Sequence, residues 1–150
     1  MVDDCVFCKI SDKKIPGYFV DENSRFFAIM DVFPPTFSGK VTMPTVLVIT
    51  KEHEDSNIFE NMDEQLYSDM MLYSKRIAVA MQRALSPERV CMIYEGMEIA
   101  HAHVKLYAVF KDSYPGYLSS KKSEDNKSVM ADDKMLFDYA AKIRSELKNV

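Results

Sequence analysis

Two of the three histidines in this chain lie two residues apart, within residues 99–107 (IAHAHVKLY). Apolar residues alternate with them, which predicts a β-strand whose every second side chain lies on one face. His101, His103 and Lys105 would then form a row, and the apolar residues between them would face the core. A neutral imidazole can attack the phosphorus of a phosphate ester, and a neighbouring cation can hold the charge on its oxygens. The segment therefore predicts phosphate-ester chemistry, with a solvated strand face as the alternative.

A second set of reactive residues begins near the N-terminus. Cys5 and Cys8 have the Cys-x-x-Cys spacing, which suits either two ligands of one metal ion or a redox pair. A redox pair would require a thioredoxin-like βαβ context, and the following residues predict a hairpin instead. If both thiols converge with His53 and His101, they form the Cys₂His₂ donor set that zinc favours, and His103 is the one imidazole left over. Two inert thiols and a surface His53 are the alternative.

The elements that must position these residues include several strands. Five segments have the composition of β-strands: residues 18–21, 25–30, 46–50, 89–94 and 102–110. The turn-forming residues 22–24 join the first two into a hairpin. Residues 31–44 contain three prolines and predict a long loop with a short extended piece at 40–43.

Helical patterns separate and follow these strands. Apolar residues recur at helical spacing over 62–85, with Asn61 and Glu64 placed like a capping box and Pro87 beyond the end. Residues 9–14 predict a short helical turn and 131–147 a closing helix. The order predicts an α+β fold: a five-stranded antiparallel sheet, one long helix between strands three and four, and a C-terminal helix.

Composition bounds the organisation and the partners. The 150 residues, 47% of them hydrophobic, predict one domain over 1–150, with a core at 5–110 and a C-terminal connector and helix at 111–150. Within that part, residues 113–130 predict an exposed connector. The net charge of −4 argues against binding a nucleic-acid polymer and leaves a small nucleotide open.

The chain also lacks the marks of a membrane or secreted protein. Its apolar runs are short and its start has no secretion signal, so we expect a cytoplasmic protein without membrane contact. Three cysteines do not form a disulfide framework, and Cys91 in an apolar run is expected to be a buried thiol.

Four segments, in this order, together resemble the histidine triad (HIT) superfamily of nucleotide hydrolases and transferases: residues 5–10 (CVFCKI), 27–31 (FAIMD), 46–53 (VLVITKEH) and 101–103 (HAH). The resemblance implies a HIT-like fold. It also implies cleavage at the α-phosphate of nucleoside phosphoramidates or dinucleoside polyphosphates, through a nucleotidyl-histidine intermediate. Family members are usually homodimers.

The resemblance also implies a structural zinc site. Many bacterial members hold zinc through two N-terminal cysteines, the histidine that closes the Lys-x-His segment and the first histidine of the triad. The matching residues here are Cys5, Cys8, His53 and His101.

The same resemblance implies roles around the nucleotide. His103 matches the family's nucleophile, and Asp31 matches the acid that binds the ribose hydroxyls. Phe7 and Ile29 match the apolar lining of the base pocket. Gly96 matches a glycine of the family, and we assign it to the nucleotide-binding residues. For Asp31 alone, an ordinary turn role is the default interpretation.

Several positions depart from the family's pattern. Lys105 replaces the third histidine, Ala108 a proline, and Met97 and Glu98 the usual Gln and Ser. The Gly-His pair before the third strand is replaced by residues 44–45, after a loop about six residues longer.

Two of these departures fall on residues we assign to catalysis beside His103. Lys105 could contact phosphate as a constant positive charge or extend into solvent. Glu98 would repel a phosphate unless Lys105 neutralises it; otherwise it could donate a proton or point away.

Two alternatives stay open at this level. The departures allow a nucleotide-binding protein without turnover, acting as a sensor or interaction module. Part of the apolar stripe of the long helix fits either the core or the seam of a homodimer. The residues concerned are Met70, Tyr73, Ile77 and Met81.

Overall fold

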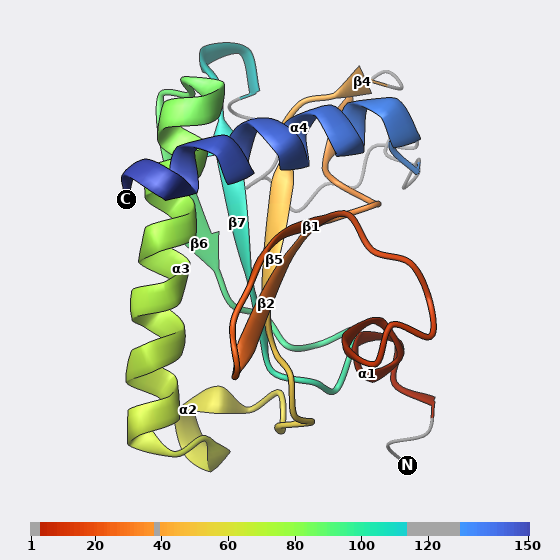
Figure 1. Ribbon diagram of the computed structural model, residues 1–150, viewed down its shortest axis with the longest axis vertical. Coiled ribbons are helices and arrows are strands. Elements are labelled where there is room, and N and C mark those ends of the chain that lie inside the picture. Colours follow the sequence, from red (N-terminus) through yellow and green to blue (C-terminus); the bar gives the residue numbers. More distant parts are fainter. Residues whose placement is uncertain (1–3, 38–39, 114–129) are drawn as a thin grey trace.

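Two neighbouring strands, β5 and β7, lie in the interior of the sheet (Figure 1). The computed structural model describes residues 4–37, 40–113 and 130–150. The sheet has five antiparallel strands in the order β1-β2-β5-β7-β6. Their bounds are β1 Phe19–Glu22, β2 Phe26–Met30, β5 Thr45–Thr50, β6 Arg89–Ile93 and β7 His103–Val109. This is the five-stranded antiparallel sheet, and the α+β class, that the sequence predicts.

The register of the central strands decides which face carries the chemistry. Ile49 pairs with His103 and Leu47 with Lys105, so these side chains share one face of the sheet. As predicted, Val104 and Leu106 of β7 and Ala102 just before it pack against the helices on the other face, and Ala108 of β7 does so too. His101 precedes β7, where its N–H bonds the carbonyl of Ile99 at 2.8 Å. Of the predicted row, His103 and Lys105 belong to the strand and His101 stands just before it, while the rings of His101 and His103 both pack against Phe7.

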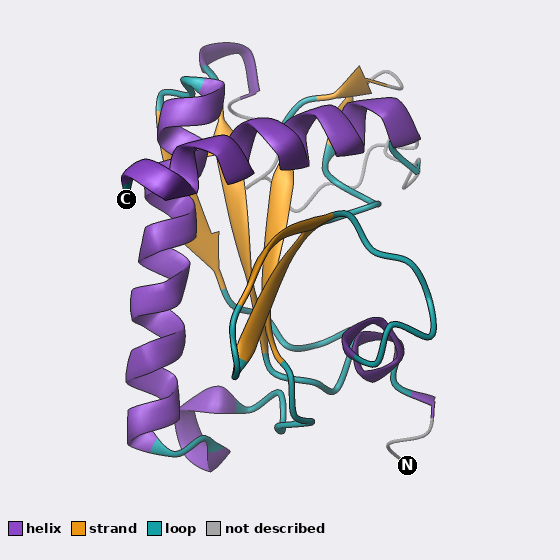
Figure 2. Cartoon of the chain, viewed as in Figure 1, coloured by secondary structure: helices purple, strands orange, loops and turns teal. Residues whose placement is uncertain are grey.

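Two long helices cover the face opposite His103 (Figures 1 and 2). The helices are α1 Val6–Ser11, α2 Ile58–Asn61, α3 Glu64–Leu85 and α4 Asp133–Glu146, with 3₁₀ turns at Lys111–Ser113 and Leu147–Asn149. The Asp63 carboxylate caps α3 by accepting N–H bonds from Gln65 and Leu66 at 3.0 and 3.1 Å. The predicted capping box is therefore wrong: Asp63 already satisfies these N–H groups, and Glu64 is the first residue of the helix.

The stripe on α3 belongs to the core of this chain. Met70, Tyr73, Ile77 and Met81 are buried among residues of the sheet and of α4. The structure thus decides between core and dimer seam for these residues in favour of the core. None of the described helices is long and apolar enough to cross a membrane.

The long loop after β2 contains a small hairpin. Strand β3, Thr36–Phe37, pairs with β4, Lys40–Val41, where the sequence predicts a short extended piece. The predicted connector at 113–130 lies almost wholly outside the described residues.

The second face of the sheet is partly covered by α1. Phe7 and Ile10 of this helix pack on apolar residues of β2 and β5: Phe27, Ile29, Leu47 and Ile49. Because β5 ends where β7 begins, the loops after β5 and before β7 lie at one end of the sheet, close to α1 (Figure 1). This end gathers the reactive residues.

Candidate functional site

Four metal-ligating side chains from three separate segments meet at this end of the sheet. Cys5 precedes α1 and Cys8 lies within it, while His53 follows β5 and His101 precedes β7. Their ligand atoms all lie within 4.8 Å of one another. The structure thus brings together the four residues that the sequence proposed as one site.

The distances within this cluster fit a zinc ion. His101 Nδ1 lies 3.3 Å from Cys5 Sγ and 3.6 Å from Cys8 Sγ, and His53 Nδ1 lies 3.4 Å from Cys8 Sγ. In a tetrahedral site with usual Zn–S and Zn–N bonds, ligand atoms are roughly 3.3 to 3.8 Å apart. Three of the six donor-atom pairs are therefore spaced as a shared zinc requires, and all six lie within 4.8 Å.

The hydrogen bonds of His101 determine which ring nitrogen is unprotonated and faces the thiols. Its Nε2 lies 2.9 Å from the carbonyl oxygen of Thr50, and a carbonyl only accepts, so Nε2 carries the proton. The lone pair is then on Nδ1, toward Cys5 and Cys8. Burial lowers the pKa of His101 to about 4, so the ring is neutral at pH 7, as a metal ligand must be.

The thiols complete the test of fit. Burial, with the neighbouring Cys5, raises the pKa of Cys8 to about 11. A bound divalent cation reverses this preference, because it stabilises the thiolate directly. His53 is exposed at the rim, with its ring 4.8 Å from that of His101 in an edge-on arrangement. Cys91, the third cysteine, lies apart on β6 and is half-buried rather than buried.

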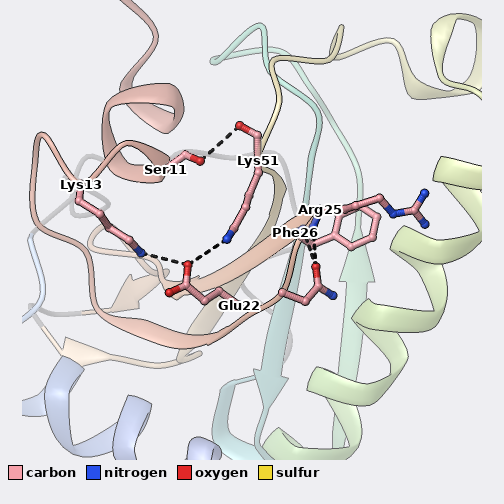
Figure 3. A network of polar contacts seen from close by, with 7 residues as sticks. Ser11, Lys13, Glu22, Arg25, Phe26 and Lys51 are labelled. Carbon is pink, nitrogen blue, oxygen red and sulfur yellow. Dashed lines mark hydrogen bonds and ion pairs between the residues drawn. The ribbon is translucent and has the colours of Figure 1, made fainter.

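A polar network ties α1 to the segment that leads to His53 (Figure 3). Ser11 donates to the carbonyl of Lys51 at 3.3 Å. The Lys51 ammonium lies 3.2 Å from the carboxylate of Glu22, which Lys13 also contacts at 3.1 Å. The network therefore holds two of the three ligand-bearing segments against the β1–β2 hairpin, whose turn is closed by N–H bonds to Asn23.

His103 lies beside this cluster on the same face of the sheet. It is only 4% exposed, and its Nδ1 lies 2.7 Å from the carbonyl oxygen of His101. Nδ1 therefore donates, and the lone pair is on Nε2. Burial lowers the pKa of His103. The chain thus holds a neutral imidazole whose free nitrogen is Nε2, the form a nucleophile requires.

The two residues expected to line a base pocket are both buried. Phe7 is 3% exposed and packs edge-on against the rings of His101 and His103, with centroids 5.7 and 5.1 Å apart. Ile29 is 4% exposed in the same apolar cluster. Both lie on the His103 face, and Phe7 fixes the orientation of the two imidazoles.

Lys105 does not extend into solvent. Its side chain is 16% exposed and forms a close ion pair with Glu95, in the loop after β6. Burial opposes the charge, but Glu95, helped by Asp31 and Glu98, outweighs it and raises the pKa of Lys105. Of the two alternatives, the structure excludes the solvent-directed side chain.

Sequence reasoning missed Glu95, although the register contains a signal. Ile93 pairs with Lys105 across β6 and β7. Side chains alternate along a strand, so two residues further on the chain returns to the same face. This alternation, counted from Ile93, would have pointed to Glu95 once the pairing of Ile93 with Lys105 was known. The sequence alone does not give that pairing.

Asp31 lies directly after β2 and makes a turn. Its Oδ1 accepts the N–H of Phe33 at 2.9 Å, so the default turn role is present. Burial raises the pKa of Asp31, while Lys105 and His103 act in the opposite direction. The carboxylate thus lies within electrostatic reach of both groups on β7.

The loop from β6 to His101 depends on a glycine. Gly96 has φ +61°, and a Cβ there would lie 2.6 Å from Tyr94 Oη and 2.9 Å from the carbonyl of Ser56. Beyond it, Glu98 is exposed and lines a cavity of about 350 Å³ together with Cys5 and His53. Glu98 raises the pKa of Asp31 and of Lys105, so its carboxylate lies within electrostatic range of both groups.

An antiparallel sheet carrying His-x-His-x-Lys beside a Cys₂His₂ cluster defines a protein of the histidine triad type. No family model matches the chain. It is, however, 32% identical over 126 residues to an uncharacterized HIT-like protein of Borreliella burgdorferi, covering 79% of this chain and 85% of that protein. The chain therefore belongs to the HIT family, which confirms the resemblance seen in the sequence.

Solved structures show the same fold. A hypothetical histidine triad nucleotide-binding protein from Sulfolobus tokodaii matches with a TM-score of 0.74 and 24% identity, over 97% of this chain and 93% of that one. A Zn-bound histidine triad family protein from Mycobacterium smegmatis matches with a TM-score of 0.65 and 21% identity, over 99% and 96%. The fold prediction is therefore confirmed in its family as well as in its class.

Proposed function

We propose that this chain is a nucleotide hydrolase or transferase that acts on the α-phosphate of nucleoside phosphoramidates or dinucleoside polyphosphates. The observation that carries the proposal is the neutral His103, whose Nδ1 is held by the His101 carbonyl and whose Nε2 has the lone pair. A side chain that needs no deprotonation can attack phosphorus directly. The nucleotide-binding relative from Sulfolobus tokodaii supports the choice of ligand.

In the proposed reaction, His103 Nε2 attacks the α-phosphorus. The bond to the leaving group breaks, and the leaving group takes the electron pair and a proton, for which Glu98 is the proposed donor. Water then attacks the nucleotidyl-histidine and gives a proton to the Glu98 carboxylate, which releases the nucleoside monophosphate and restores both the imidazole and the protonated Glu98. Lys105 balances negative charge on the non-bridging oxygens, and the Asp31 oxygen not used in the turn accepts from a ribose hydroxyl.

Zinc is the proposed structural ion of the Cys₂His₂ cluster. Cys5, Cys8, His53 and His101 would hold it, and the ion would supply cross-linking of three chain segments. His101 contributes to both parts of the site, because its ring is a proposed ligand while its carbonyl orients His103. The zinc-bound relative from Mycobacterium smegmatis supports this assignment.

A second function is favoured by one contact. The ion pair between Lys105 and Glu95 occupies the cation that would serve phosphate. A protein that binds a nucleotide without turning it over, as a sensor or interaction module, would tolerate that arrangement. The two functions differ in whether a covalent adduct forms on His103.

The test replaces His103 with asparagine, which keeps a polar group near the His101 carbonyl and removes the nucleophile. We expect turnover of adenosine 5′-phosphoramidate and of diadenosine polyphosphate to fall by about 10³-fold or more. AMP affinity, measured by calorimetry, and the melting temperature serve as folding controls. Unchanged turnover in His103→Asn would exclude this nucleophile.

Mass spectrometry separates the two functions. After an alkaline denaturing quench, which preserves P–N bonds, the hydrolase should carry one adenylyl group on the peptide containing His103. AMP binding with neither adduct nor turnover across the substrate panel would establish the non-catalytic function instead.

A further inference from the structure

Glu95 holds the ammonium group that lies two residues from His103 along β7. Its carboxylate and Lys105 form an ion pair, in which the lysine side chain is largely buried while the glutamate side chain is 39% exposed. Glu95 comes directly before Gly96, whose positive φ turns the loop back toward the site. The carboxylate therefore lies where it contacts the cation and can still swing into solvent.

The charges near Lys105 are mostly negative. Asp31, Glu95 and Glu98 all act on the pKa of Lys105 in the same direction, as carboxylates close to an ammonium. Lys105 is the cation among the main influences on the pKa of His103, and Glu95 and Asp31 act in the opposite direction. A site for a highly charged polyphosphate gathers several cations, because each added phosphate adds charge to be balanced. Among the described residues, three carboxylates act on the ammonium of Lys105.

We propose that Glu95 determines the specificity of the site by charge, occupying Lys105 in the free protein and opposing ligands in proportion to their negative charge. The inference rests on the proposed function and narrows its substrate class. A phosphate monoester, or a phosphoramidate with a neutral leaving group, carries fewer negative charges than a polyphosphate and so displaces Glu95 at a lower cost. A nucleotide with a polyphosphate leaving group meets repulsion from the same carboxylate.

A series of adenosine ligands of rising charge tests this directly. Affinities for adenosine, AMP and ADP are measured by calorimetry on the wild type and on Glu95→Gln. Relative to the wild type, we expect Glu95→Gln to gain about tenfold in affinity for AMP and more than that for ADP. The affinity for adenosine should stay unchanged. A change that is equal for all three ligands, or no change, overturns the proposal, since a merely structural effect does not follow ligand charge.

Two further variants exclude simpler explanations. Glu95→Asp keeps the charge and should keep the discrimination against ADP. Glu88→Gln removes an exposed glutamate before the other end of β6 and should leave the series unchanged. If Glu88→Gln gives the same gain as Glu95→Gln, net charge rather than Glu95 is responsible, and the proposal fails.

A Lys105→Met background separates two effects of Glu95: its ion pair with Lys105 and its direct repulsion of the ligand. Removal of Lys105 should reduce the gain from Glu95→Gln several-fold, because no cation is then released. A full gain in that background overturns the role of the ion pair. A wild-type protein that binds none of the three ligands overturns the proposed function itself, whereas normal AMP binding with an unresponsive Glu95→Gln overturns this inference alone.

Discussion

At position 96, the backbone conformation and the available space both require glycine. The left-handed φ of +61° is unfavourable for other residues, and a Cβ would lie 2.6 Å from Tyr94 Oη. The loop that begins there leads to Glu98 and His101, so strain at this residue would be transmitted to both. The family resemblance assigns Gly96 to nucleotide binding, and the geometry gives a physical reason for the glycine.

We therefore expect Gly96→Ala to lower the free energy of unfolding by about 1 to 3 kcal/mol. Urea denaturation measures this. A matched control is Ser86→Gly at the end of α3, where a non-glycine residue already has φ 51°. That change relieves strain and should raise stability by about 0.5 kcal/mol. If the two variants changed the free energy of unfolding equally, backbone strain at position 96 would not explain the requirement for glycine.

Single residues were predictable where the chemistry depends on side-chain type and short spacing. His103 and Lys105 follow from alternation along one strand, and their shared face is confirmed by the register. Glu95 was missed because its contact depends on how β6 pairs with β7. The roles assigned to His103, Lys105, Glu98 and Asp31 stay predictions until the variants are measured.

At the scale of elements, α3 supplies the clearest case. The apolar repeat predicts a helix, and the structure confirms it over Glu64–Leu85. The same repeat does not say what covers the stripe. Burial of Ile77 beneath the sheet and α4 decides that question for this chain.

Replacing Ile77 with alanine tests this assignment. A cavity in a closed core should lower the free energy of unfolding by about 2 to 5 kcal/mol, at every protein concentration. Leu72 on the same helix is 64% exposed, and its replacement with alanine should change stability by no more than about 0.5 kcal/mol. A loss at Ile77 that grows as the protein is diluted would place it at an interface between copies.

Element boundaries were predicted less well than element types. Helix α1 begins at Val6 instead of Lys9, because Cys5 already stands at its N-terminal boundary. Asp63 caps α3 in place of the predicted capping box. At α3 the hydrogen bonds actually formed decide among several polar residues that could begin the helix, whereas α1 begins without a side-chain cap.

At the scale of the whole molecule, the Cys₂His₂ cluster joins parts of the chain that are far apart in sequence. Cys5 and His101 are separated by 96 positions, yet Sγ and Nδ1 lie 3.3 Å apart. A metal ion there would link α1 to both loops at one end of the sheet. Homodimer formation and cytoplasmic location stay predictions.

We expect purified protein to contain about one zinc per chain, measured by inductively coupled plasma mass spectrometry. Removal with a strong chelator should lower the melting temperature by about 10 °C or more, because the ion binds the folded state alone. Cys8→Ser should lower the zinc content, whereas Cys91→Ser should not, since Cys91 lies outside the cluster. Zinc-free protein that was never exposed to chelator would refute the site.

The sequence by itself determined the types of the main elements, the alternation that places His103 and Lys105 on one face, and the four residues proposed as zinc donors. These depend on residue type and short spacing, which local backbone geometry converts directly into position. Only the tertiary structure decided that the four donors converge, that the α3 stripe is core, and that Lys105 is held by Glu95. Those contacts join residues on different elements, and their energy depends on strand register and packing, which the order of residues does not show.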